Sequence, residues 1–313
     1  MTGFTTIARF LVLTVAVTLP GLATGKEPEK EANGALDTAT IAREMGKAGE
    51  TQGDVYKISL PRTDLQVTVE GVLLKPGLAL GSWIAFKPVG QGAVAHGDLV
   101  LGEDEVAPVV RELEEHGVRV TALHNHLMHE LPRVMFLHFW GQGEAGTLAQ
   151  QLKQALSNTK TPIGEAKKGE TRAEEVGFDA EQIQSMLGHK GTVKNGVLHV
   201  FVPRPETVTE RGVELPPSMG TATAINVQGA GAGKVAATGD FVMSEDEVNH
   251  VARALAAHGI QVTALHNHLV HSSPNLFFMH FWANDSAEKV SKGLRAGLGA
   301  CPTLTPEPLV RLR

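Results

Sequence analysis

An internal duplication constrains the fold of this 313-residue chain more than any other feature. Residues 97–140 match residues 239–282 at a constant offset of 142, without gaps, and 26 of the 44 aligned positions are identical. Self-similarity over this length means that the chain repeats one structural unit. We therefore expect two units of equal local geometry that pack against each other as a pseudo-dimer.

Each unit combines the signatures of strands and helices. Short alternating runs bounded by Gly, Pro and Asp are typical of strands. Two stretches with apolar residues at i, i+3, i+4 and i+7 predict two helices per unit. The predicted fold is α+β, with two tandem units, each a mostly antiparallel sheet with two helices. The predicted boundaries are 36–158 for the first unit, 159–177 for a polar linker, 178–300 for the second unit and 301–313 for a C-terminal tail.

The N-terminus resembles an export signal. Arg9 is followed by an apolar run at residues 10–19 and by the small residues Ala23 and Gly25, which predicts a signal peptide over residues 1–25. The apolar run is too short to cross a bilayer, which takes about 20 residues. The only cysteine is Cys301, so no cysteine stands at the cleavage point for a lipid. We expect a periplasmic or extracellular protein with no stable membrane anchor after cleavage.

Charge and motifs argue against two classes of ligand. The net charge is −6, and it becomes 27 − 34 = −7 once Arg9 is removed with the signal peptide, so a basic surface for nucleic acid is not expected. The GAGAGK segment at 229–234 departs from a phosphate-binding loop at Gln228 and Val235, so no nucleotide cofactor is expected. The remaining partner class is an unidentified small-molecule or envelope ligand.

Histidines dominate the duplicated block. His124 and His126 alternate along a predicted strand, so both project from one face, about 7 Å apart. If Ala122 pairs with His138 on the return strand, all three imidazoles share that face, whereas a slip of one residue sends His138 to the other side. His129 lies in the connecting loop, within reach of His126. The equivalent histidines of the second unit are His266, His268, His271 and His280.

Three imidazoles on an apolar face suit a divalent metal such as Zn²⁺ or Cu²⁺. The sequence therefore predicts one metal ion in each unit. Asp98 and Asp240 are candidate carboxylate ligands or partners that fix a histidine tautomer, and Asn125 and Asn267 are further candidate partners. Two alternatives stay open: a metal-free binding or catalytic site, and histidines that fill a half-polar core by bonding to backbone carbonyls or to the asparagines.

These patterns support two hypotheses about function. The first is an exported protein that binds a divalent metal through a duplicated histidine site and uses the ion for hydrolysis. The second is a non-catalytic envelope binding or scaffold module whose histidines are structural.

The segments EDEV at 103–106, VTALHNHL at 120–127 and HFWG at 138–141, in this order, resemble the LppY/LpqO family. The resemblance covers residues 36–158 and 178–300. It implies an exported bacterial domain of unknown function built from two units, and it brings no established reaction or catalytic residue. Lipoprotein members carry a cysteine at the signal end, which this chain lacks, so a lipid anchor is not implied.

The signal sequence leads to a first testable prediction. Protein recovered from its native host should have lost about 25 residues, because the apolar run ends in small residues suited to cleavage. Intact-mass measurement checks this. A full-length mass in an envelope fraction would instead show an uncleaved anchor.

Overall fold

The computed structural model describes Met1, residues 34–164 and residues 176–301. Apart from Met1, the predicted signal peptide lies outside the described residues, as do residues 165–175 of the predicted linker and 302–313 of the predicted tail. Among the described residues, no helix is long and apolar enough to cross a membrane.

The first repeat forms a six-stranded antiparallel sheet with the strand order β1-β2-β5-β6-β8-β7. Its elements are α1 (Thr38–Met45), β1 (Glu50–Gln52), β2 (Val55–Pro61), β3 (Thr68–Val69), β4 (Val72–Leu73), α2 (Pro76–Ala79), β5 (Gly81–Val89), β6 (Gly92–Gly102), α3 (Glu103–Glu115), β7 (Arg119–His124), β8 (Val134–Gly143) and α4 (Ala145–Leu156).

The second repeat has the same strand order, β9-β10-β13-β14-β17-β15, and all its pairs are antiparallel. Its elements are α5 (Ala180–Leu187), β9 (Gly191–Lys194), β10 (Val197–Pro203), β11 (Thr209–Glu210), β12 (Val213–Glu214), the 3₁₀ helix η1 (Pro217–Met219), β13 (Ala222–Gly231), β14 (Lys234–Met243), α6 (Glu245–Ala257), β15 (Gln261–His266), β16 (Ser272–Ser273), β17 (Phe277–Ser286) and α7 (Ala287–Gly299). The predicted fold class, α+β with two tandem units, is confirmed.

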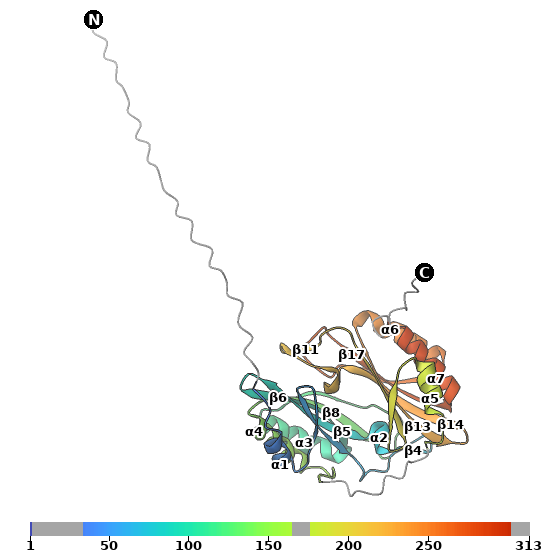
Figure 1. Ribbon diagram of the computed structural model, residues 1–313, viewed down its shortest axis with the longest axis horizontal. Helices are drawn as coiled ribbons and strands as arrows, with labels where there is room; N and C mark the ends of the chain where they lie inside the picture. Colours follow the sequence, from blue (N-terminus) through green and yellow to red (C-terminus); the bar gives the residue numbers. More distant parts are fainter. Residues whose placement is uncertain (2–33, 165–175, 302–313) are drawn as a thin grey trace. The chain divides into compact units, whose positions relative to one another are not determined.

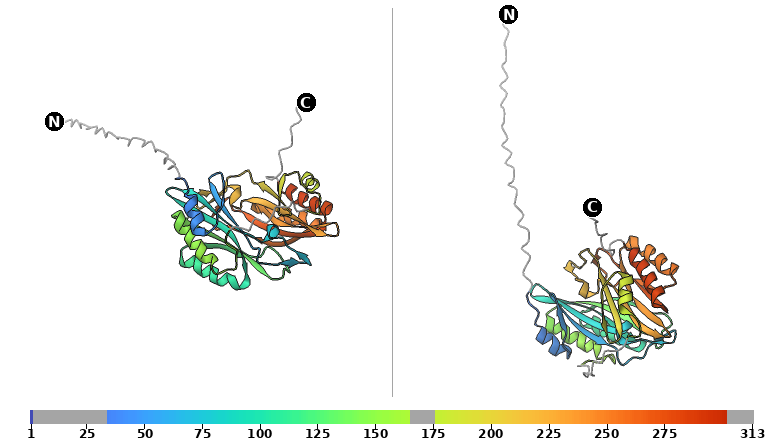
Figure 2. Two further views of the ribbon diagram at one scale, coloured as in Figure 1. Left: turned by 60° about the horizontal axis from the view of Figure 1, so that its bottom comes forward. Right: turned by 45° about the vertical axis from the view of Figure 1, so that its right-hand side comes forward.

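Helices cover one face of each sheet. In the first repeat α1, α3 and α4 lie together on the sheet, and in the second repeat α5, α6 and α7 do the same (Figures 1 and 2). Buried apolar side chains from the helices and from alternate strand positions form one core per repeat. Because strand side chains alternate, the remaining positions, including those of the histidines, lie on the opposite face.

Each repeat has a helix that the sequence analysis did not predict. These helices, α1 and α5, have eight residues each and bury only two apolar side chains apiece, too few to show a helical period. Their end signals are nevertheless in the sequence. Asp37 and Asp179 accept hydrogen bonds at the N-termini, and Gly46 and Gly188 end the helices in the left-handed conformation.

The second face of each sheet is covered by the other repeat. Leu78, from the arm that links β2 to β5, is buried in one cluster with Val197 and Trp282 of the second repeat. Reciprocally, Leu215 and Met219 from the equivalent arm are buried against the first sheet. The side chain of Gln228 accepts a hydrogen bond from the Lys75 backbone N–H at 2.8 Å and donates one to the Leu73 carbonyl at 2.9 Å. The repeats thus form a pseudo-dimer with exchanged arms.

The first part of the predicted linker packs on the first repeat. The backbone N–H of Lys160 donates to Glu105 of α3 at 2.7 Å, and Thr161 is buried. The segment that follows α4 therefore belongs structurally to the first repeat for several residues beyond the predicted boundary at 158.

The exchanged arms predict that the two repeats unfold together. Leu78→Ala removes a fully buried side chain from a cluster shared by both repeats, so it should lower the free energy of unfolding of the whole chain by about 2–5 kcal/mol. Far-UV circular dichroism and tryptophan fluorescence should show one coincident transition. Leu73→Ala, at a side chain that is 56% exposed, is the control and should change stability by less than about 0.5 kcal/mol. Two separate transitions, with only one shifted, would contradict this picture.

A candidate metal centre between the repeats

The hairpin register brings three histidine positions of each repeat to one face. Ala122 pairs with His138, and Ala264 pairs with His280, after a register shift that follows Val120 and Val262. This is the register in which the sequence predicted a common face for His124, His126 and His138.

His126 lies beyond the end of β7, in a segment that crosses onto the second repeat. Asn125 donates through its side chain to the Leu127 carbonyl at 2.9 Å and to the Thr263 carbonyl at 3.2 Å. The Thr263 hydroxyl in turn donates to the His126 carbonyl at 2.5 Å. These bonds hold the HNH segment of the first repeat, residues 124–126, against β15. They thereby place His126 beside the histidines of the other repeat, whose HNH segment is residues 266–268.

Six histidines, three from each repeat, converge in a single cluster, which we call the histidine centre. Candidate ligand atoms of His124, His126, His138 and His268 all lie within 4.8 Å of one another, and so do those of His124, His266 and His280. The expectation of one separate three-histidine site in each unit was therefore wrong. Strand alternation predicts which imidazoles share a face, but the face itself is packed against its copy, so the two sets merge.

The ring contacts in the histidine centre follow the pseudo-twofold relation between the repeats. His124 stacks on its own counterpart His266, with 3.5 Å between ring centroids. His126 stacks on His280 at 3.7 Å, and His138 stacks on His268 at 3.8 Å. The offset of 142 exchanges these last two pairs, so the contacts are isologous.

The two loop histidines of the predicted site stay outside the histidine centre. His129 and His271 are exposed, and neither belongs to a potential ligand group. His129 has a left-handed backbone, with φ of 60°, which turns the loop away after Met128. The backbone N–H of His271 donates to the buried carboxylate of Glu210, 3.0 Å from Oε2, and this contact fixes its loop on the arm of the same repeat.

The predicted carboxylates flank the histidine centre, whereas the predicted amides do not contact it. Asp98 is paired across the sheet with His138, and its Oδ1 lies 3.9 Å from His138 Nε2. Asp240 is paired in the same way with His280. The amide of Asn267 donates to the Leu276 carbonyl at 2.7 Å, and that of Asn125 bonds to backbone as described, so both organise loops rather than orient imidazoles.

Two residues beside the histidine centre were missed by the sequence analysis. His96 is buried and its ring stacks 5.9 Å from that of His138, with Nδ1 2.8 Å from the Phe139 carbonyl. Lys57 donates to the Ser218 carbonyl at 2.8 Å and lies 3.9 Å from the Trp83 ring centroid. A signal for His96 was available, because it precedes Asp98 by two residues and so lies on the same strand face.

Burial keeps the imidazoles neutral and favours the protonated form of the carboxyls. Burial lowers the pKa of His124 to about 3 and that of His266 to about 4. For the same reason the pKa values of the other four histidines lie well below 6.5. Burial raises the pKa of Asp240 to about 7, and burial together with the neighbouring Asp240 raises the pKa of Asp98. At neutral pH the six rings therefore offer free lone pairs.

All six Nε2 atoms of the histidine centre are buried and have no hydrogen-bond partner within the described part of the chain. An unpartnered buried polar atom costs about 1–3 kcal/mol, so six cost about 6–18 kcal/mol. A domain has a net stability of only about 5–15 kcal/mol. A bound cation would satisfy these atoms together, and Nε2 is a usual metal-ligating atom of histidine.

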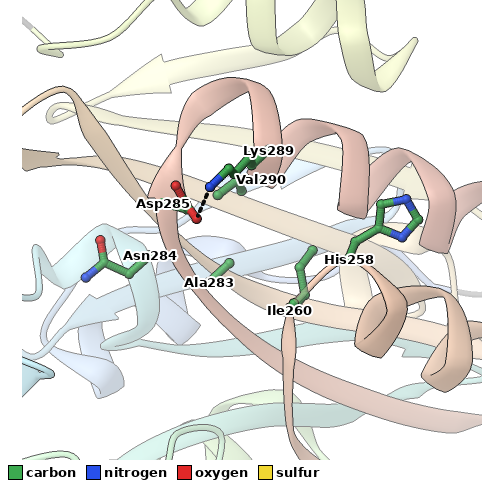
Figure 3. A pocket seen from close by; sticks show the side chains of 8 residues that line it. His258, Ile260, Ala283, Asn284, Asp285, Lys289 and Val290 are labelled. Atoms are coloured by element: carbon green, nitrogen blue, oxygen red, sulfur yellow. Dashed lines mark hydrogen bonds and ion pairs between the residues drawn. The ribbon is translucent and has the colours of Figure 1, made fainter.

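A surface pocket of about 100 Å³ at the start of α7 offers much less chemistry. Figure 3 shows His258, Ile260 and Ala283 around it, with Lys289 paired to Asp285 at 3.2 Å. Its lining includes none of the predicted site residues, and its charged groups already pair with each other.

The comparisons with known proteins identify a family without an activity. The family model described as Domain of Unknown Function (DUF1259) matches the chain twice, over residues 39–158 and 181–300. The chain belongs to this family. The match shows two copies of an uncharacterised domain. It does not show that the chain belongs to the LppY/LpqO family. No curated protein matches the chain.

Two solved structures share weak similarity with the chain. One is a trimeric bacterial microcompartment shell protein PduB, with 14% identity over 82% of this chain and 90% of that chain, at a TM-score of 0.22. The other is EtuB from Clostridium kluyveri, with 10% identity over 81% and 89% of the two chains, at a TM-score of 0.20. TM-scores this low carry no argument about this chain.

The lowered histidine pKa values predict acid sensitivity of the metal-free protein. Below pH 6.5 the unfolded chain protonates these six imidazoles while the folded chain does not, so stability is lost as the pH falls towards 4. The raised pKa values of Asp98 and Asp240 oppose this, because the folded state there holds up to two protons more. The difference for these eight groups is about four protons, each worth about 1.4 kcal/mol per pH unit, and His96, whose pKa burial lowers to about 4, adds about one more.

Urea denaturation of chelator-treated protein between pH 7 and 5 measures this effect. The midpoint should fall steeply over this interval in the parent and in His129→Ala, whose imidazole is exposed. A midpoint that does not change would show that the six imidazoles are not buried as neutral groups.

Proposed function

We propose that this chain binds divalent transition-metal ions at the histidine centre, with Zn²⁺ and Cu²⁺ as the ions best suited to imidazole ligands. The observation that carries the proposal is the convergence of six buried Nε2 atoms that have no hydrogen-bond partner among the described residues. Neutral imidazoles need no deprotonation before they bind a metal, so burial prepares the site for a cation at neutral pH.

The alternative, in which the histidines are structural, needs hydrogen bonds to satisfy the rings. Among the described residues the contacts of this kind are single ones: Nδ1 of His280 lies 3.1 Å from the Gly239 carbonyl, and Nδ1 of His124 lies 3.3 Å from the Asn125 carbonyl. Both contacts use Nδ1 and leave Nε2 directed elsewhere. A ligating histidine characteristically donates its other ring N–H to such a carbonyl, so these contacts favour the metal-binding proposal.

Metal-dependent hydrolysis is the second candidate. His124 and His266 are partly exposed at atoms other than the buried Nε2, which makes this side of the histidine centre the nearest to solvent. Zinc lowers the pKa of bound water to about 7 and can expand to five ligands, which leaves room for water beside the protein ligands. This activity depends on metal binding and would act on a small-molecule or envelope ligand.

The proposed location is outside the cytoplasm, in the periplasm or extracellular space. It rests on the signal-like residues 1–25 and on the resemblance to the LppY/LpqO family, which we keep as part of this proposal.

Metal uptake by a matched pair of variants tests the proposal. Untagged, chelator-treated parent should bind Zn²⁺ saturably in calorimetry. His268→Ala removes a buried ring of the histidine centre and should weaken binding by at least about 10-fold, whereas His271→Ala removes an exposed ring three residues away and should bind like the parent. The proposal fails if the parent takes up no Zn²⁺ or Cu²⁺ saturably, or if the two variants behave alike.

A further inference from the structure

We infer that the histidine centre holds two metal ions in pseudo-equivalent positions, each bound by three imidazoles and one carboxylate drawn from both repeats. The inference rests on the proposed function and adds the number of ions and the role of Asp98 and Asp240. In the first position the ligands are His124, His138, His268 and Asp98. In the second they are His266, His280, His126 and Asp240.

The potential ligand atoms divide into two groups rather than one. If a single ion were held by all six imidazoles, their nitrogens would lie within one group around one point. Instead they form one group of four and one of three that share only His124. The first group contains His124, His138 and His268 of the first position, and the second contains His266 and His280 of the second position.

The pseudo-twofold relation between the repeats assigns the remaining histidine. His126 belongs to the group of four by distance, but its ring stacks on that of His280, with 3.7 Å between centroids. Its pseudo-twofold counterpart His268 stacks in the same way on His138 at 3.8 Å. Each position therefore takes one histidine of its HNH segment from the other repeat, and the two positions are related by the offset of 142.

A carboxylate lies beside each position, outside the groups of histidine nitrogens that lie within 4.8 Å of one another. Oδ1 of Asp98 is buried, has no hydrogen-bond partner among the described residues, and lies 3.9 Å from His138 Nε2, which is also buried and unpartnered. This distance is too long for a hydrogen bond and close to the separation of about 3.4 Å between two ligand atoms on one zinc ion. Asp240 stands opposite His280 at the same register position in the second sheet.

The local sequence explains how each aspartate reaches its position. Gly97 precedes Asp98, and a side chain there would meet the Trp83 carbonyl at 2.5 Å and the Phe139 ring at 2.7 Å. Gly239 precedes Asp240, where a side chain would meet the Ala224 carbonyl at 1.9 Å. The glycine in each Gly-Asp pair therefore allows the close strand packing that sets the carboxylate against the histidine of the neighbouring strand.

Two carboxylates and six imidazoles match the charge of two divalent cations better than that of one. Once a bound ion displaces the proton of its aspartate, each position offers one negative charge and three neutral nitrogen donors, a common ligand set for zinc and copper. Two ions held in one centre can bind a bridging water or oxyanion between them, so the substrate class that fits is a small oxyanion or its ester.

The number of zinc ions bound by two variants, each with one aspartate replaced by the neutral asparagine, tests the inference. The chelator-treated full chain is titrated with Zn²⁺ in calorimetry, and bound zinc is counted by elemental analysis. The parent should bind two ions. Asp98→Asn and Asp240→Asn, which keep the side-chain shape, should each retain one ion at parent affinity and bind the other about 10- to 100-fold more weakly. Asp54→Asn, at a half-exposed aspartate paired with Lys87, is the control and should bind two.

Electron paramagnetic resonance of the Cu²⁺-loaded parent provides a test that does not depend on whether a variant folds. Two ions in one centre should give the spectrum of a coupled Cu²⁺ pair, and each Asp→Asn variant should give that of an isolated ion.

One bound ion in the parent, or two ions at parent affinity in both Asp→Asn variants, would overturn the inference while the proposed function stands. If neither Zn²⁺ nor Cu²⁺ binds saturably, both the inference and the proposed function fail.

Discussion

Each sheet of this protein has helices on one face only, and the need to cover the other face determines how the rest is arranged. A sheet whose faces both carry apolar residues must bury both. In this chain the second face is buried by the other repeat, with the arm of each repeat packed over its neighbour's sheet. A single repeat would leave that face, and the histidines on it, exposed to water. Duplication within one chain thus supplies the partner surface at a high effective concentration.

The histidine centre follows from this packing, because the pseudo-twofold relation places equivalent residues together. His124 stacks on its own counterpart His266. His126 stacks on His280, the counterpart of His138, and His138 stacks on His268, the counterpart of His126, as expected for an isologous contact. The surroundings are less symmetric. Lys57, Trp83 and His96 lie beside Asp98 in the first repeat. The corresponding strand positions of the second repeat carry His199, Ala224 and Thr238. The set of six histidines is therefore duplicated, whereas the residues around it differ between the repeats.

Sequence reasoning predicted the features of the fold that depend on residues near one another in the chain. The duplication, the antiparallel sheets and the common face of His124 and His126 all follow from local periodicity. The register of the hairpin did not follow, because both registers bury apolar side chains and the observed pairing depends on a register shift between Val120 and Ala122 that no sequence pattern indicates. The exposed position of His129 could not be predicted either, since it depends on a left-handed backbone at a residue other than glycine or asparagine.

The largest difference between sequence and structure concerns which histidines act together. Alternation along a strand identifies neighbours within one repeat, but it contains no information about what lies opposite the face. The structure places His268 of the second repeat against His138 of the first, and His126 of the first against His280 of the second. In the two-ion arrangement that we propose, loss of one HNH histidine would damage the metal position anchored on the other repeat. Neither copy can then lose its histidines independently, which gives a physical reason why one chain carries the same histidine block twice.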